Sequence, residues 1–249
     1  MKALITGASS GIGREMAIYL SELGYDVIVV ARSKGKLEDL KKLVKTKVLV
    51  YEYDLSKIDN CYKLYNDIKD KNVDIVINNA GFGLFGDYSE SDLDVELNMI
   101  DLNVKAVHIL TKLFINNKHA KYVLNVASSA GLMMGGPLMS TYYATKSYVR
   151  SYTLGLYEEL RKNNSDKVIS VLCPGPVETN FNKRANVKFN LEELSARYVA
   201  RYAIQKMFKK KLIIIPGFSV RIGLFFSRFL PTKIALKIAY KIQERKKTP

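Results

Sequence analysis

The sequence predicts a doubly wound α/β fold, in which helices cover both faces of one parallel sheet. Short apolar runs recur along the chain, and a helical pattern follows most of them. The runs are continuously apolar rather than alternating, which is typical of parallel strands buried on both faces. Strands that alternate with helices join by right-handed crossovers into one sheet. No linker or internal repeat interrupts this pattern, so we expect one domain over residues 1–249.

The first expected strand spans residues 2–6. A helix begins near Gly13 after a glycine-rich turn, and Met16, Ala17 and Leu20 share one of its faces. The same alternation then continues to residue 173. The remaining expected strands are 27–31, 48–53, 73–78, 122–127 and 168–173, and the remaining expected helices are 34–44, 58–69, 93–116 and 141–162.

The composition is that of an ordinary globular protein, with 48% hydrophobic and 25% charged residues. The two cysteines, Cys61 and Cys173, are far apart and have no second Cys or His at metal-ligand spacing. This argues against a disulfide framework and a metal site. Because the first apolar strand follows Met1 and Lys2 directly, we expect no secretory signal and a cytoplasmic location.

The glycine-rich turn joins the first expected strand to the first expected helix. Residues 6–13 read TGASSGIG, a Gly-x3-Gly-x-Gly spacing. Glycines at such a turn let the backbone approach a pyrophosphate, whose charge then rests on N–H groups at the start of the helix. A plain tight turn is the alternative, but the flanking strand and helix favour nucleotide binding on a Rossmann-type sheet.

Further motifs follow this turn in a fixed order. Asn78-Asn79-Ala80-Gly81 comes after the fourth expected strand, and Tyr142 and Lys146 form a Tyr-x3-Lys pair near the start of a helix. Pro174-Gly175 follows the sixth strand, with Thr179 shortly after. Together these motifs resemble the short-chain dehydrogenase/reductase family, in the branch whose basic C-terminal tail is related to that of long-chain 3-oxoacyl reductases.

The resemblance implies two sets of site residues. The implied cofactor contacts are Gly7, Ser9, Ser10, Gly11, Ile12, Gly13, Arg32, Asp54, Leu55, Asn79, Ala80, Gly81, Tyr142, Lys146, Pro174, Gly175, Val177 and Thr179. The implied catalytic residues are Asn103, Ser128, Tyr142 and Lys146. In this family pattern Ser128 hydrogen-bonds the substrate oxygen, Lys146 holds the nicotinamide ribose, and Asn103 positions a water.

Tyr142 is the expected proton donor and acceptor. Hydride transfer to a carbonyl leaves an alkoxide that needs a proton, and a tyrosine with its ordinary pKa of about 10 is a poor base at neutral pH. Lys146 lies one helical turn away, where its ammonium, together with an oxidised nicotinamide, would lower that pKa. We therefore predict carbonyl–alcohol interconversion. A nucleotide-sensing or membrane-associated binding protein on the same fold is the alternative.

Two positions beside Tyr142 admit alternatives. Ser129 has the family's usual spacing of 13 residues to Tyr142, whereas the Asn-Val-Ala-Ser-x-Ala-Gly pattern selects Ser128. We favour Ser128 because the loop at residues 132–137 is one residue longer than usual, and insertions belong in loops. Tyr143 breaks the Tyr-x3-Lys spacing and is interpreted as a packing residue.

The end of the second expected strand indicates which nicotinamide binds. Arg32 follows that strand and no carboxylate does, which suits a 2′-phosphate. NADPH is therefore favoured over NADH, and the alternative is that Arg32 is a solvated loop residue. In the family, Asp54 and Leu55 after the third strand flank the adenine.

Nearly all of the net charge of +15 lies in residues 183–249, a basic substrate cap and helical tail. Within it, Arg221 and Arg228 recur among apolar residues, and Lys233, Lys237 and Lys241 form a stripe in residues 233–247. Such stretches are typical of membrane interfaces, although neither reaches the ~18 apolar residues needed to span a bilayer. A lid over the substrate, a dimer contact and a solvated basic face are the alternatives.

We expect a small, lipophilic or acyl-chain carbonyl substrate, because the tail is similar to that of long-chain 3-oxoacyl reductases. The family also implies a homodimer or a homotetramer. Nucleic acid is not an expected partner, since the basic and aromatic residues form no reader motif. The predicted protein is cytoplasmic, with peripheral membrane contact through the tail.

Overall fold

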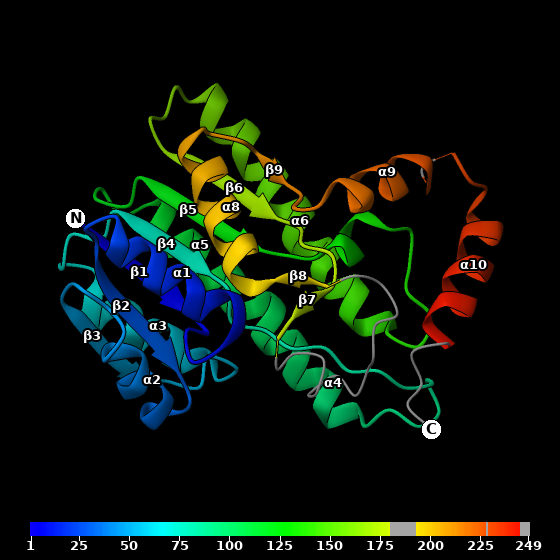
Figure 1. Cartoon of the computed structure of the whole chain (residues 1–249), viewed down its shortest axis with the longest axis horizontal. Coiled ribbons are helices and arrows are strands. Elements are labelled where there is room, and N and C mark those ends of the chain that lie inside the picture. The colour runs from blue at the N-terminus through cyan, green and yellow to red at the C-terminus, as the bar shows by residue number, and fades with distance from the viewer. Residues whose placement is uncertain (180–192, 228, 245–249) are drawn as a thin grey trace.

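The computed structural model describes residues 1–179, 193–227 and 229–244 (Figure 1). The predictions that fall on Arg228 and on residues 245–247 lie outside this range. In the described chain, one parallel sheet has seven strands in the order β3-β2-β1-β4-β5-β6-β9. Their bounds are β1 Lys2–Thr6, β2 Asp26–Ala31, β3 Val48–Glu52, β4 Ile75–Asn78, β5 Tyr122–Val126, β6 Val168–Leu172 and β9 Ile213–Ile214.

Helices connect these strands. They are α1 Gly11–Glu22, α2 Lys34–Lys41, α3 Ile58–Ile68, α4 Leu93–Ile100, α5 Val107–Ile115, α6 Ser140–Lys162, α8 Ala196–Phe208, α9 Phe218–Ser227 and α10 Thr232–Glu244. Side-chain caps begin two of them: Asp92 accepts hydrogen bonds from Asp94 N and Val95 N at α4, and Ser195 accepts one from Tyr198 N at α8. Such caps satisfy N–H groups that the helix itself leaves unpaired.

The strand order reverses between β1 and β4. From β1 the chain moves outward through β2 to β3, then returns to add β4, β5, β6 and β9 on the other side, and every pair is parallel. This arrangement confirms the doubly wound α/β prediction. It also opens a crevice at the carboxyl ends of β1 and β4, where such sheets bind ligands.

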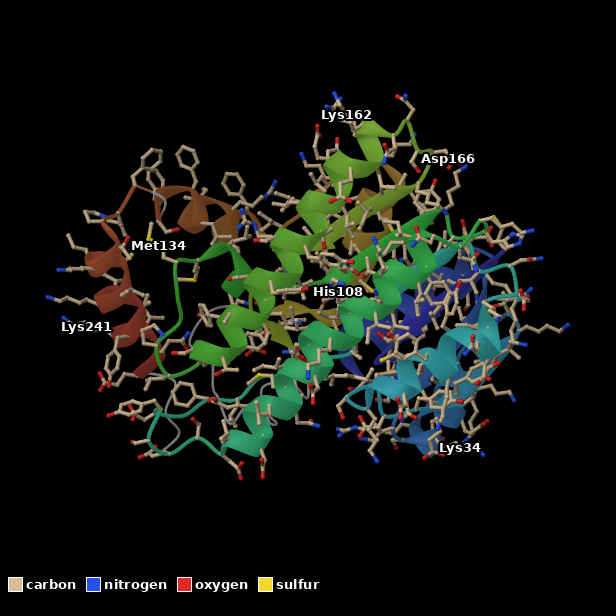
Figure 2. The ribbon with its side chains drawn as sticks, turned by 180° about the vertical axis from the view of Figure 1, so that it is seen from behind. Lys34, His108, Met134, Lys162, Asp166 and Lys241 are labelled. Atoms are coloured by element: carbon tan, nitrogen blue, oxygen red, sulfur yellow. The ribbon has the colours of Figure 1, made fainter. Side chains whose placement is uncertain are left out.

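Both faces of the sheet are buried, which explains the continuously apolar strands. Alternate residues of β1 illustrate it: Leu4 packs with α3, α5 and α6 on one face, while Ala3 and Ile5 pack with α1, α2 and α8 on the other. Figures 1 and 2 show the two layers from opposite sides. Because the side chains of a strand alternate between faces, two covered faces require apolar residues at every position.

The structure differs from the predicted elements in three places. The helix expected over residues 34–44 ends at Lys41, and Leu43 beyond it is 49% exposed. The long helix expected over residues 93–116 is interrupted by a π-helical turn, Asp101–Ala106, which contains Asn103. Helix α8, strand β9 and the short pair β7 (Val177–Glu178) and β8 (Leu194–Ser195) had not been predicted.

Helices α9 and α10 extend beyond the carboxyl ends of the strands, on the side of the molecule where β6 and β9 lie (Figure 1). No residue of α9 is buried, and Ala239 and Gln243 are the buried residues of α10. Among the described residues, no helix combines the length and the hydropathy that a bilayer span requires. The tail is therefore an outer layer over one end of the sheet.

Candidate active site

One large cleft, of about 1790 Å³, runs along the carboxyl ends of the strands. Its lining includes the residues that directly follow β1, β2, β3, β4 and β5, and also Pro174, two residues after β6. Every site residue predicted from the sequence lines this cleft except Gly13 and Asn103, which lie behind its wall. The structure thus brings together side chains separated by more than a hundred positions in the chain.

Side-chain hydrogen bonds between the ends of β1 and β4 hold the glycine-rich turn, together with the backbone bond from Gly7 N to Val30 O at 2.8 Å. Thr6 Oγ1 accepts hydrogen bonds from Asn79 N and Ala80 N, both at 3.0 Å, and Asn79 Nδ2 donates to Thr6 O at 3.0 Å. Gly7 adopts a φ of +67°, and a Cβ there would lie 2.8 Å from Ala80 Cα. At Gly13 a Cβ would overlap Asn79 Nδ2 and Gly7 O, so this glycine permits the close contact of turn and helix.

This turn fits the pyrophosphate of a dinucleotide. Ser9, Ser10, Gly11 and Ile12 line the cleft at the N-terminus of α1, where backbone N–H groups and the helix dipole favour an anion. Thr179 closes over the turn from the β6 side, because a Cβ on Gly11 would lie 3.0 Å from its Cγ2. The glycines here leave room for a phosphate to approach the backbone.

Tyr142 is buried in α6 and faces Ser128. Burial raises the pKa of Tyr142 well above its ordinary value, and a hydrogen bond with the Ser128 hydroxyl opposes this rise. Ser128 Oγ also donates to Pro174 O at 3.5 Å and accepts from Ala130 N at 3.2 Å. Ser129 instead begins a 3₁₀ turn, with its backbone N–H donating to Pro174 O at 2.7 Å. Of the two serines, Ser128 is the one paired with Tyr142.

Lys146 lies one turn beyond Tyr142 and is 5% exposed. Its Nζ donates to Val126 O at 3.0 Å and lies 5.9 Å from the centre of the Tyr142 ring. Burial lowers the pKa of Lys146 to about 8. We expected this ammonium to lower the pKa of Tyr142. Burial is instead the largest effect on that pKa, and the group that lowers it is the Ser128 hydroxyl.

Asn103 is fully buried in the π-helical turn and connects three elements. Its Oδ1 accepts from Phe82 N at 3.1 Å, and its Nδ2 donates to Phe82 O at 2.8 Å and Thr145 Oγ1 at 3.2 Å. A Cβ on Gly81 would lie 2.8 Å from Asn103 Oδ1. Asn103 therefore fastens the chain after β4 to α6 beside Lys146, and its side chain does not line the cleft.

The end of the cleft beside β2 and β3 is basic. Arg32 follows β2, is exposed, and lines the cleft together with Ser33 and Lys36. In the described part of the chain no ion pair involves Arg32 or Lys36. Lys36 was missed from the sequence, although its position four residues after Arg32 was a usable signal.

Asp54 and Leu55 line the same end of the cleft, shortly after β3, which is the neighbour of β2. Asp54 Oδ1 accepts from Ser56 N at 3.1 Å and from Ser56 Oγ at 2.8 Å, which folds the loop back on itself. Leu55 is 3% exposed and provides an apolar wall. An adenine ring fits such a slot between an apolar side chain and the sheet.

The other end of the cleft is apolar and is covered by the tail. Its lining there, none of it predicted as site residues, includes Met133, Met139, Tyr143, Leu224, Phe226, Phe229, Leu230, Leu236, Ile238, Ala239, Ile242 and Gln243. One hydrogen bond joins the tail to α6, from Gln243 Nε2 to Tyr143 Oη at 2.5 Å. The signal in the sequence was that Gln243 shares the helical face of Leu236 and Ala239.

The fold and this cleft define a dinucleotide-binding α/β protein. Comparison with known proteins narrows the class. The family model for short chain dehydrogenases matches residues 1–189. The chain is 30% identical over 214 residues to the dehydrogenase/reductase SDR family protein 7-like of Dictyostelium discoideum, covering 80% of this chain and 64% of that protein.

A second relative is the very-long-chain 3-oxoacyl-CoA reductase of Mycosarcoma maydis, 30% identical over 73% of this chain and 54% of that protein. The chain thus spans less than two thirds of the length of either relative. Among solved structures, the short-chain dehydrogenase from Sphingobium yanoikuyae in complex with NADPH superimposes with a TM-score of 0.80 at 25% identity, over 91% of this chain and 92% of that one.

The chain therefore belongs to the short-chain dehydrogenase/reductase family. The resemblance found in its motifs is confirmed.

The lowered pKa of Lys146 predicts a pH-dependent stability. Between pH 8 and 10.5 the folded protein binds fewer protons at Lys146 than the unfolded chain does, so stability should rise with pH. Replacement by methionine removes this gain. We expect the free energy of unfolding of the wild type, relative to that of Lys146→Met, to increase across this range by on the order of 3 kcal/mol. Urea denaturation at a series of pH values measures it, and a constant difference would contradict the lowered pKa.

Proposed function

We propose that the protein is an NADP(H)-dependent oxidoreductase that interconverts a carbonyl and an alcohol on a lipophilic substrate, with Tyr142 as general acid and base. One observation carries the proposal: Tyr142, Ser128 and Lys146 meet in the cleft between a basic end and an apolar end. A basic end suits a phosphorylated nucleotide, and an apolar end suits a substrate with little charge.

The bound nicotinamide would supply or accept the hydride. Different residues would hold the parts of the dinucleotide. The glycine-rich turn would bind the pyrophosphate, Asp54 and Leu55 the adenine, and Lys146 the ribose next to the nicotinamide. Arg32 and Lys36 would hold the 2′-phosphate, since a planar guanidinium can bind phosphate through two parallel hydrogen bonds. Thr179, Pro174, Gly175 and Val177 would close the cleft over the cofactor.

Ser128 and Tyr142 would act on the substrate oxygen. The hydroxyl of Ser128 is already oriented by Pro174 O and Ala130 N, so it can point at an oxygen that approaches Tyr142. Burial keeps the Tyr142 hydroxyl protonated at neutral pH, which suits reduction, because the alkoxide formed is a strong base and takes this proton. Oxidation needs the phenolate, which the Lys146 ammonium and the positive charge of an oxidised cofactor would stabilise.

Asn103 is proposed as a positioning residue. It holds the loop after β4 against Thr145, one residue before Lys146, and so keeps the lysine at a set distance from Tyr142. The proposal also includes the water that, by the family resemblance, Asn103 positions.

The apolar end of the cleft supports a lipophilic substrate. Its walls come from α9, α10 and the loop before α6, and they carry aliphatic, methionine and aromatic side chains. Similarity to a very-long-chain 3-oxoacyl-CoA reductase agrees with this choice. Removing such a substrate from water into this end would provide binding energy in proportion to the apolar area buried.

We also propose that the outer face of the tail contacts anionic membrane surfaces. Two phenylalanines of α9 that do not line the cleft, Phe218 and Phe225, are 70% and 56% exposed. Lys233, Lys237 and Lys241 are exposed on α10, and Figure 2 shows Lys241 extending outward from that helix. Exposed aromatic groups beside lysines suit an anionic lipid interface. The homodimer or homotetramer expected from the family stays a prediction.

Tyr142→Phe should abolish most turnover while leaving cofactor binding intact. We expect kcat for NADPH oxidation, with ketones and 3-oxoacyl thioesters of rising chain length, to fall by about 10²–10⁴-fold, since that is the usual contribution of a general acid. The Kd for NADPH should stay constant. Tyr148→Phe, which removes a hydroxyl from the exposed face of the same helix, is the matched control. Tight NADPH binding without wild-type turnover on any substrate would favour the nucleotide-sensing alternative.

Arg32→Ala and Lys36→Ala should weaken NADPH binding selectively. Each loses a charge-assisted hydrogen bond to the 2′-phosphate, so we expect about a 10- to 100-fold rise in the Kd for NADPH and no change for NADH. Lys34→Ala is the control, because Lys34 opens the same helix without lining the cleft. Fluorescence titration with both cofactors measures this, and equal losses for NADPH and NADH would disprove the assignment.

Replacing Lys233, Lys237 and Lys241 together by glutamine should weaken binding to vesicles that contain phosphatidylserine. With each lysine worth about 1 kcal/mol near an anionic surface, the loss should be about 100-fold. A triple replacement of the exposed Lys41, Lys42 and Lys45 removes the same charge elsewhere and should bind normally. Co-sedimentation with anionic and neutral vesicles provides the measurement. Wild-type protein that binds neither kind of vesicle would refute membrane contact.

A further inference from the structure

The apolar end of the cleft contains one buried polar pair that the proposed reaction does not use. Gln243 of α10 is 2% exposed and Tyr143 of α6 is 8% exposed, and both line the cleft. Their side chains meet in the 2.5 Å hydrogen bond from Gln243 Nε2 to Tyr143 Oη. The neighbouring lining residues are apolar, among them Met139, Leu236 and Ala239.

This hydrogen bond leaves part of the pair's hydrogen-bonding capacity unused. Gln243 Oε1 is buried and accepts no hydrogen bond from any of the residues that the structure describes. Tyr143 Oη acts as an acceptor in its bond with Gln243, so its own proton is available for donation. Burial raises the pKa of Tyr143 to about 12, which keeps that proton in place at neutral pH. The pair thus presents two donors, the Tyr143 O–H and the second N–H of Gln243, and one acceptor, Gln243 Oε1.

The same free donors and acceptor result if the side-chain amide of Gln243 is rotated so that Oε1 and Nε2 exchange places. The Tyr143 hydroxyl would then donate to Oε1, leaving Nε2 as the donor and the phenol oxygen as the acceptor. A purely structural role for Gln243, in which its hydrogen bond holds α10 against α6, accounts for the Nε2 atom but not for the buried Oε1. A buried acceptor without a partner costs free energy, and a ligand that donates to it would remove that cost.

We propose that Tyr143 and Gln243 form a second polar subsite, which binds a neutral donor–acceptor group of the substrate, a hydroxyl or a secondary amide. The proposal rests on the proposed function, because it treats the apolar end of the cleft as the substrate site. It assigns the substrate class more closely: a lipophilic carbonyl compound with one further neutral polar group.

The charges around the cleft explain why this group is neutral. Among the described residues, the charged ones that line the cleft are Arg32, Lys36, Asp54 and Lys146. The first three follow β2 and β3 at the opposite end, and Lys146 donates to Val126 O. A carboxylate at Tyr143 and Gln243 would be desolvated without a counter-charge and would face the amide oxygen, so it is disfavoured.

The position of the pair sets where the polar group lies in the substrate. Tyr142 and Tyr143 are consecutive, and their ring centres are 6.2 Å apart with the rings nearly perpendicular, at 77°. A substrate whose carbonyl reaches Tyr142 can therefore extend its second polar group toward the neighbouring Tyr143. The loop before α6 supports this arrangement, because a Cβ on Gly136 would overlap the Tyr143 ring.

Matched probes that NADPH cannot reduce test the subsite directly. N-octylacetamide and octyl acetate differ by an N–H in place of an oxygen, and octanol and methyl heptyl ether differ by the presence of a hydroxyl proton. Isothermal titration calorimetry, with and without NADPH, should show the amide or the alcohol binding at least about tenfold tighter than its partner. Preference within the amide pair alone identifies an amide ligand, and preference within the alcohol pair alone identifies a hydroxyl.

Three variants separate the subsite from general packing. Gln243→Met keeps the volume and loses both polar atoms, while Tyr143→Phe keeps the ring over Gly136 and loses only the hydroxyl. Both should reduce the preference to within about threefold, whereas Leu236→Met, an apolar exchange on the same face of α10, should keep it. If Gln243→Met does not fold, Tyr143→Phe still tests the subsite.

Two results would overturn the subsite: wild-type protein that discriminates within neither pair, or a preference that survives in Gln243→Met. The probes contain no ketone or aldehyde, so they report on the subsite even if the protein reduces no carbonyl. Conversely, turnover of plain ketones without discrimination between the probes would leave the proposed function standing and remove only the subsite.

Discussion

The contact between Thr6 and Asn79 is the constraint on which the rest of the site depends. A phosphate-binding turn must leave the backbone N–H groups at the start of the helix available, so other groups must hold its shape. Here the hydroxyl at the end of β1 and the amide at the end of β4 hold the turn from one side, and Val30 O accepts from Gly7 N at 2.8 Å on the other. Because β1 and β4 are neighbours only where the strand order reverses, the doubly wound topology itself creates this contact.

The part of the molecule that could be predicted from sequence is the part where local pattern and tertiary burial agree. Strands covered on both faces must be apolar throughout, and the glycines at positions 7, 11 and 13 have a steric reason that holds in any sequence with this turn. Ser128 could be chosen over Ser129 because a loop insertion was the simpler explanation, and the structure pairs Ser128 with Tyr142. The π-helical turn around Asn103 could not be predicted, since its sequence fits a regular helix equally well.

The tail could not be predicted in the same way, because its contacts are made with residues far away in the chain. Gln243 and Tyr143 are 100 positions apart, and nothing local to either indicates the other. Strand β9 pairs with β6 through only two residues, and its apolar run suited a buried helix as well as a strand. The stripe of lysines on α10 was evident from the sequence, whereas the opposite face, which lines the cleft, became recognisable as a wall only once α6 was in place.

Two glycines in the loop before α6 have a consequence for how this protein can diverge. Gly136 lies against the ring of Tyr143, and a Cβ on Gly135 would lie 3.0 Å from Leu236 of α10. Loop and tail therefore form a complementary pair that meets across the mouth of the cleft, although nearly a hundred residues separate them. A chimera that takes its tail from another family member would need the matching loop as well, so substrate range should be inherited as a two-part module rather than as the tail alone.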